Sequence, residues 1–166
     1  MREKDFDRLF DEHAAPLLRF LIYRTGDRAL AEDILGDTFE RALRKRSLFD
    51  RRRGSEKAWL YTIATNLLRD RARRRDVEER AYAEAYLPEP MLVGGDGGLG
   101  RFEQRATVME ALEILSAEER EAVALRFGAD MTVPEIAKVL DQPLTTIEGR
   151  VYRALRKLRA ELGDDD

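Results

Sequence analysis

The C-terminal part of the chain carries residues whose types could contact nucleic acid. Between Arg150 and Arg159 there are five Lys or Arg residues and no Asp or Glu. Arginine can donate two hydrogen bonds to guanine, threonine can bond to a base edge or a phosphate, and glycine lets a backbone approach closely. One face of the predicted helix has this chemistry: Thr146, Gly149, Arg150 and Arg153. The alternative is a solvated helix end, where cations favour the helix dipole.

This stretch follows the signals of a helix-turn-helix. Only residues 141–143 separate the last two predicted helices, and the second follows Pro143 and runs to about Leu162. A longer, arginine-rich second helix can lie in the major groove of DNA. Two capping boxes mark the preceding helix starts, Ser116 with Glu119 and Thr132 with Glu135.

An apolar stripe explains how the last helix would be held with its basic face outward. Apolar side chains of this helix should pack on those of the helix before it. The expected contacts join Ile147, Val151, Ala154, Leu155 and Leu158 to Ile136, Val139 and Leu140.

The N-terminal part offers a second basic surface. Arg51, Arg52 and Arg53 precede a predicted helix that ends in a run of arginines over residues 69–75. Trp59 and Tyr61 lie at the start of that helix, where an aromatic ring beside cations could stack on an unpaired base. Trp59 falls on the apolar stripe of the helix, so Tyr61 is the predicted stacking residue.

An acidic face lies on the helix before that surface, formed by Glu32, Asp33, Asp37 and Glu40. These carboxylates could dock on a basic protein partner, or they could form a solvated face. No metal site is expected, because they have neither neighbouring histidines nor the pattern of a calcium-binding loop.

These surfaces are expected on an all-α fold of two small helical domains. Helical periodicity over 4–25, 29–43 and 59–68 predicts an antiparallel N-terminal helical bundle, and no stretch alternates with period two. Pro88, Pro90 and five glycines between positions 94 and 100 predict a flexible acidic linker. The predicted domains are residues 1–78 and 105–163, the second containing the helix-turn-helix, with the linker over 79–104.

Composition and charge narrow the function classes. Residues 1–75 carry 19 Lys/Arg against 13 Asp/Glu, although the net charge of the chain is −3, which favours a polyanion as partner of the first domain. The chain has no cysteine and one histidine, and no nucleophile–base pair or phosphate loop is found, so neither an enzyme nor a cofactor is expected. Neither a signal peptide nor a membrane span is expected from the sequence, which predicts a cytoplasmic protein without membrane insertion.

Three segments, in order along the chain, resemble the extracytoplasmic-function (ECF) group of sigma factors, the subunits that direct bacterial RNA polymerase to promoters. Residues 31–39 read A-E-D-I-L-G-D-T-F, similar to the segment by which the family binds core polymerase. Residues 59–70 read W-L-Y-T-I-A-T-N-L-L-R-D, similar to its helix for promoter melting and the downstream element. Residues 143–150 read P-L-T-T-I-E-G-R, similar to its helix for the upstream element.

The resemblance implies three partners: core RNA polymerase, promoter DNA and an anti-sigma factor. Core polymerase would be bound by Glu32, Asp33, Asp37, Thr38 and Glu40. The melted downstream (minus ten) element would be bound by Arg52, Arg53, Tyr61, Asn66, Arg69, Arg73 and Arg74. The upstream (minus thirty-five) element would be read as duplex by Thr145, Thr146, Glu148, Gly149, Arg150, Arg153 and Arg156.

Two other readings remain open from the sequence. One is a divergent sigma-like interaction module that binds polymerase or an anti-sigma factor without starting transcription. The other is an ordinary helix-turn-helix regulator, which would not need the N-terminal segment in this form.

The chain departs from the family pattern at two places. Gly36 and Asp37 replace a usual Gln-Glu pair, which could retune core binding, and Glu148 and Gly149 replace a usual Lys-Ser pair. Glu148 repels phosphate but can accept a hydrogen bond from cytosine, and a glycine inside a helix costs about 1 kcal/mol relative to alanine. An atypical upstream element is therefore expected.

Replacing Glu148 by lysine should change the sequence that the last helix prefers. The variant exchanges an acceptor for a donor, so the preferred base at the contacted position should change, by about 1–3 kcal/mol of discrimination. Initiation on a library of promoter fragments randomised in the upstream element measures this preference. An unchanged preference in Glu148→Lys would contradict a role for Glu148 in base reading.

Overall fold

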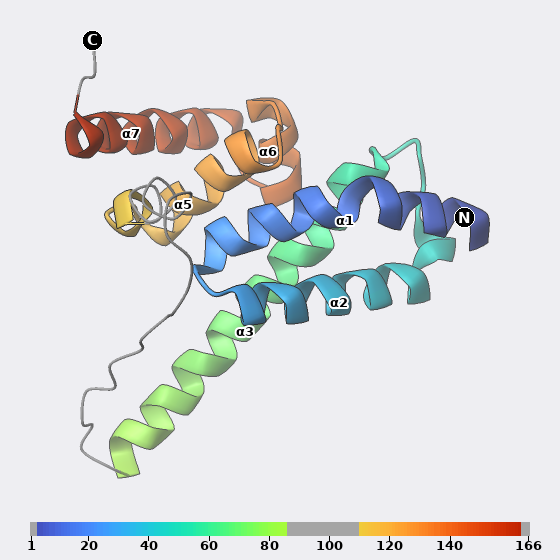
Figure 1. Cartoon of the computed structure of the whole chain (residues 1–166), viewed down its shortest axis with the longest axis horizontal. Helices are drawn as coiled ribbons and strands as arrows, with labels where there is room; N and C mark the ends of the chain where they lie inside the picture. The colour runs from blue at the N-terminus through green and yellow to red at the C-terminus, as the bar shows by residue number, and fades with distance from the viewer. Residues whose placement is uncertain (1–2, 86–109, 164–166) are drawn as a thin grey trace, which may run out of the picture.

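A computed structural model describes residues 3–85 and 110–163, and the regular elements in these two ranges are all helical (Figure 1). This agrees with the predicted all-α class. The N-terminal elements are α1 (Glu3–Thr25), α2 (Arg28–Arg44), the short 3-10 helix η1 (Arg46–Leu48) and α3 (Glu56–Ala85). The C-terminal elements are α5 (Ala117–Val123), the π-helical turn η2 (Ala124–Gly128), α6 (Val133–Leu140) and α7 (Leu144–Leu162).

A tight turn sends α2 back along α1. Gly26 has a φ of 68°, a conformation that glycine adopts without steric cost, and its N–H donates to the Ile22 carbonyl at 2.8 Å. Asp27 then caps α2, because its Oδ1 accepts a hydrogen bond from the N–H of Leu30 at 3.1 Å. Figure 1 shows the two helices side by side, with α3 packed across them.

Helix α3 is longer than the sequence pattern predicts. It continues to Ala85, through residues that the domain prediction assigned to the linker from position 79 onward. Residues 76–85 contain helix-forming Ala, Glu and Arg and no Gly or Pro, which favours continuation of the helix through this stretch. The remainder of the predicted linker, residues 86–104, lies outside the described residues.

The predicted helix-turn-helix is present, with its predicted caps. Ser116 and Thr132 both form capping boxes, with Glu119 and Glu135 respectively. The turn after α6 places Asp141 in the left-handed region at φ 51°, where its N–H reaches back to the carbonyls of Ala137 and Lys138. These local signals set the start of α6 and the short connection to α7.

The apolar side of α7 packs on two partners, where the sequence pattern predicted one. Ile147 is fully buried in the core cluster that contains Ile136, Val139 and Leu140 of α6, as expected. Ala154 and Leu158 instead join a second cluster that contains Leu112, Leu115 and Val123. Leu155 is only half-buried. The second half of α7 therefore lies on α5 and the segment before it.

The N-terminal and C-terminal helices share one apolar core. Leu125 of η2 and the following Met131 belong to the same buried cluster as Phe20 of α1 and Tyr61 of α3. A hydrogen bond also joins α3 to the segment after η2: Lys57 Nζ donates to the Asp130 carbonyl at 3.2 Å. The contact between the two parts of the chain is therefore a continuation of the protein interior.

Two arginines of the N-terminal helices also approach one carboxylate of α5. Glu121 is 5% exposed, and its oxygens lie 3.9 Å from Arg24 Nε and 3.7 Å from Arg69 Nη2. Burial lowers the pKa of Arg24, and Glu121 opposes that effect. Arg24 Nε and Glu121 Oε1 have no hydrogen-bond partner, so this ion-pair group is held by charge more than by direct hydrogen bonds.

Shortening Leu125 to alanine should destabilise the whole fold, because the side chain is fully buried where the two parts meet. The expected loss in free energy of unfolding is about 2–5 kcal/mol, measured by urea denaturation. Leu48→Ala is the matched control, since Leu48 is 75% exposed and should cost less than about 0.5 kcal/mol. Equal losses in the two variants would show that the shared core does not support the fold.

Candidate nucleic-acid interface

Helix α7 presents an outward face that differs from the predicted one. The prediction placed Thr146, Gly149, Arg150 and Arg153 on the exposed side. In the structure Thr146, Gly149 and Arg150 are half-buried, whereas Arg153 is exposed. The other exposed residues along the helix are Leu144, Thr145, Glu148, Tyr152, Arg156 and Arg159 through Leu162. The outward face is rotated relative to the predicted one. The start of α7 packs on α6, but its second half packs on α5.

Tyr152 is the residue on this face that sequence reasoning missed. It is 69% exposed and is the single aromatic residue of α7, and it lies between Glu148 and Arg156 at helical spacing of four. A shallow hollow of the surface is lined by Tyr152, Leu155, Arg156, Arg159 and Ala160. The i, i+4 spacing to Glu148 and Arg156 is the signal that could have identified it.

Glu119 of α5 holds two of the five cations counted in the stripe. Its Oε2 accepts a hydrogen bond from Lys157 at 2.8 Å, and its Oε1 lies 3.7 Å from Arg153 Nε. The hydrogen bond from Lys157 lowers the pKa of Glu119, and burial opposes this shift. Glu119 therefore stays ionised, and Lys157 points toward α5 more than toward solvent.

The arginine-rich loop before α3 is fixed at both ends. The ring of Phe49 packs on that of Trp59 with 5.1 Å between centroids, which agrees with the predicted core position of Trp59. Asp50 accepts the N–H of Arg52 at 2.9 Å, and Ser55 Oγ accepts the N–H of Ala58 at 3.1 Å at the start of α3. These local bonds hold the loop in a defined turn.

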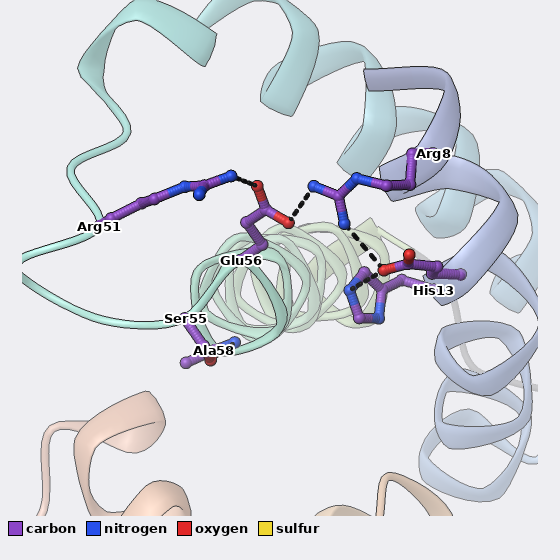
Figure 2. A network of polar contacts seen from close by, with 7 residues as sticks. Arg8, His13, Arg51, Ser55, Glu56 and Ala58 are labelled. Atoms are coloured by element: carbon purple, nitrogen blue, oxygen red, sulfur yellow. Dashed lines mark hydrogen bonds and ion pairs between the residues drawn. The ribbon is translucent and has the colours of Figure 1, made fainter. Parts of the chain in front are cut away.

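Glu56 joins this loop to α1, as Figure 2 shows. Its two oxygens accept hydrogen bonds from Arg8 at 2.8 Å and from Arg51 at 3.3 Å, and Arg8 also bonds to Glu12 at 3.0 Å. The bond to Glu56 is the main cause that raises the pKa of Arg8. His13 lies beside Glu12 at 4.0 Å, and burial lowers its pKa. Arg51 is thereby tied to Glu56 although its side chain is 76% exposed, and Arg52 and Arg53 of the same loop are exposed as well.

The basic end of α3 is partly neutralised. Asn66 and Arg74 are exposed, as the prediction requires. Arg73 bonds to Asp70 at 2.8 Å, and Arg69 is the residue that approaches Glu121. A polar hollow runs between α2 and α3 over this region, lined by Asp37, Glu40, Arg41, Arg44, Lys45, Leu67, Asp70, Arg71 and Arg74.

Tyr61 corrects the prediction of a base-stacking residue. It is fully buried, and its ring lies 5.3 Å from that of Phe20 beneath the C-terminal helices. Burial raises the pKa of its phenol, whose oxygen has no hydrogen-bond partner. Because the ring is fully buried, it cannot meet a base in this arrangement. The residues that cover it come from elements distant in sequence.

The acidic face of α2 is engaged in ion pairs. Arg71 of α3 bonds to Asp37 at 2.7 Å and lies 4.0 Å from Asp33. Glu32 pairs with Arg28, and Glu40 pairs with Arg44, each within α2. Thr38 is buried, and its hydroxyl donates to the Ile34 carbonyl, so a direct contact with a partner is excluded in this arrangement. The four acidic residues of this face are exposed or partly exposed.

Within residues 4–78 and 110–163, no group of three or more His, Cys, Asp or Glu side chains is arranged to hold a metal ion. No helix in the described part of the chain is long and apolar enough to cross a membrane.

The sequence matches two family descriptions. Residues 9–77 match sigma-70 region 2, and residues 105–158 match sigma-70 region 4. The first match runs from within α1 to within α3, and the second contains the helix-turn-helix with α7 as far as Leu158.

Curated relatives carry the same assignment. The chain is 32% identical to the ECF RNA polymerase sigma factor BldN of Streptomyces coelicolor over 96% of its own length, and spans 61% of that protein. It is 31% identical to the ECF RNA polymerase sigma factor SigL of Mycobacterium tuberculosis, over 93% of this chain and 86% of the relative.

Two solved structures share the fold over nearly the whole chain. The sigma factor RpoE, solved in complex with the anti-sigma factor NepR from Bartonella quintana, gives a TM-score of 0.79 at 28% identity, covering 98% of this chain and 99% of that one. CnrH, solved in complex with the cytosolic domain of CnrY, gives 0.72 at 26% identity, covering 99% and 92%. Regions 2 and 4 are both matched, and an arginine-bearing helix-turn-helix follows the N-terminal helices in the chain. The chain therefore belongs to the ECF group of the sigma-70 family of RNA polymerase sigma factors.

Proposed function

We propose that this sigma factor binds core RNA polymerase through α2 and reads two promoter elements with two separate surfaces. The observation that carries the proposal is the presence of an outward arginine surface on each part of the chain: the loop tip at Arg52 and Arg53, and the exposed face of α7. Phosphate contacts from such surfaces supply affinity, and side chains in a groove supply sequence reading. Residues 1–78 would act on the melted downstream element, and residues 105–163 on the upstream duplex.

The downstream surface would be formed by Arg52, Arg53, Asn66, Arg73 and Arg74, all of which are exposed. Arg69 would join them once its approach to Glu121 is released. The tie from Glu56 to Arg51 and Arg8 supports this role, since it fixes the loop through Arg51 and leaves Arg52 and Arg53 out of this contact. A pre-set loop loses less conformational entropy on binding than a free one.

The upstream surface would be formed by Thr145, Glu148, Tyr152, Arg153 and Arg156, with Thr146, Gly149 and Arg150 at its edge. Tyr152 would supply an apolar contact, such as one with a thymine methyl group, beside the donors of the arginines. Glu148 would accept from cytosine. This combination supports an upstream element unlike one read by a lysine and serine pair.

Core polymerase would be met by Glu32, Asp33, Asp37 and Glu40 of α2, with Thr38 as a buried support of the helix. The ion pair between Arg71 and Asp37 links this surface to the DNA-binding helix α3. Core polymerase bound at α2 and DNA bound at α3 would therefore contact neighbouring side chains.

An anti-sigma factor is a further proposed partner. The structural relative RpoE was solved with the anti-sigma factor NepR, and CnrH was solved with the cytosolic domain of CnrY. The proposed role needs no catalytic group of its own and places the protein in the cytoplasm, where polymerase acts.

Run-off transcription tests the proposal. Purified bacterial core polymerase would be assayed with and without this protein, on a library of promoter fragments at a stated salt concentration. Initiation that requires the protein and two shared elements supports the sigma role. Tight core binding without initiation would favour an interaction module, and absence of core binding would favour a duplex-binding regulator.

Replacing both Arg52 and Arg53 by alanine should reduce initiation at least about 10-fold while core binding is kept, because the two cations meet the melted strand and not the polymerase. Arg19→Ala is the control, since Arg19 is an exposed cation on α1 away from the loop. Open-complex formation on a selected promoter measures the effect. If the double variant opens promoters as well as Arg19→Ala does, the loop has no such role.

Replacing Tyr152 by alanine should weaken discrimination between the selected upstream element and a scrambled one, by about 1–3 kcal/mol. Tyr152→Phe should keep most of it, because the ring is retained. Leu162→Ala serves as a control, since this exposed apolar side chain lies at the far end of α7. Competition binding measures all three, and equal discrimination by Tyr152→Ala and Leu162→Ala would remove Tyr152 from the interface.

A further inference from the structure

Gly149 forms a niche for the side chain of Arg153, one turn further along α7. A Cβ atom placed at Gly149 would lie 3.1 Å from Arg153 Nη1, 3.8 Å from Cζ and 3.9 Å from Nη2. The guanidinium therefore lies against the bare backbone of the helix. A Cβ placed at Gly36, in the middle of α2, would meet nothing within 4 Å. The space that a side chain would take is thus occupied by Arg153 at Gly149, and no other atom occupies it at Gly36.

A buried carboxylate orients the same arginine from the other side. Glu119 Oε1 lies 3.7 Å from Arg153 Nε, and the side chain of Glu119 is 7% exposed. Glu119 is itself fixed, because its Oε2 accepts hydrogen bonds from Lys157 at 2.8 Å and from the N–H of Ser116 at 3.1 Å. Arg153 is therefore held at its Nε end by α5 and lies at its Nη end over Gly149.

The held arginine is still available to a ligand. Its side chain is 53% exposed, so the remaining N–H donors are open to solvent on the outer side of α7. A guanidinium donates in a fixed planar fork, and its orientation decides which phosphate or base acceptor it can meet with two bonds. Setting that orientation before binding also reduces the side-chain entropy lost in the complex.

We propose that Gly149 is a specificity-determining position of the upstream surface, which acts by placing the guanidinium of Arg153. The inference rests on the proposed reading of duplex DNA by α7. It gives a reason for a glycine in the middle of a helix, where glycine is unfavourable. A side chain at 149 displaces Arg153, and the arginine then meets DNA from another direction.

Gly149→Ala separates this role from a structural one. The atom that must move is the far end of a flexible side chain, so the variant should fold, and alanine favours the helix. Its thermal midpoint should stay the same or rise by about 3 °C, as in the matched control Gly36→Ala. Upstream preference, selected from a randomised library with core polymerase, should change about 5- to 10-fold in Gly149→Ala. It should stay unchanged in Leu162→Ala, a substitution of an exposed side chain at the far end of α7.

A double-mutant cycle identifies Arg153 as the route. Gly149→Ala should have no further effect on upstream preference in an Arg153→Ala background, because the group that it displaces is absent. An effect of equal size in both backgrounds would overturn the proposal. So would Gly149→Ala selecting the same sequences as the unmodified protein with the same affinity.

A measurement without DNA distinguishes failure of this inference from failure of the proposed function. The chemical shift of Arg153 Nε–H in nitrogen-edited NMR spectra of the free chain reports its surroundings, because Glu119 Oε1 lies 3.7 Å from this nitrogen. Both Gly149→Ala and Glu119→Gln should move the signal toward that of a solvated arginine. An unchanged signal in Gly149→Ala would refute the niche even if the protein initiates transcription. A moved signal together with no initiation on any fragment would refute the sigma role and its upstream reading while leaving the niche.

Discussion

The shared apolar core decides which side of each helix can meet a partner. Phe20 and Tyr61 from the N-terminal helices and Leu125 from η2 lie in one buried cluster, which continues to Ile147 at the start of α7. Because a buried side chain fixes the rotation of its helix, the outward faces of α3 and α7 follow from this packing. The arginines of the loop and of α7 are surface residues for this reason, and their chemistry depends on the core beneath them.

Local sequence signals were sufficient for the helix starts and the turns. The glycine at position 26, the capping boxes at Ser116 and Thr132, and the short turn after α6 each act within a few residues, so their effect can be read from the chain. The helical class and the helix-turn-helix followed from the same signals. The end of α3 at Ala85 did not, because the loss of apolar periodicity does not end a helix made of good helix formers.

The candidate site was less predictable, because it depends on contacts between distant segments. Tyr61 has the same aromatic chemistry whether it is exposed or buried, and Phe20 and the C-terminal helices bury it. The rotation of α7 that exposes Tyr152 depends on the packing of its second half on α5. Counting charges along the sequence also leaves out ion pairing. Arg71 is paired with Asp37 and Lys157 with Glu119, so each surface has fewer unpaired charges than the sequence suggests.

The continuous core also has a consequence for how the protein can be divided. A cut through the segment between α3 and α5, followed by separation of the pieces, would leave Phe20 on one piece and Leu125 and Met131 on the other without their covering side chains. Contiguous apolar patches of this kind promote self-association. Fragments that carry a single sigma region would therefore need a solubilising substitution at this seam, and the intact chain is the better starting material for crystallisation or for screening of inhibitors.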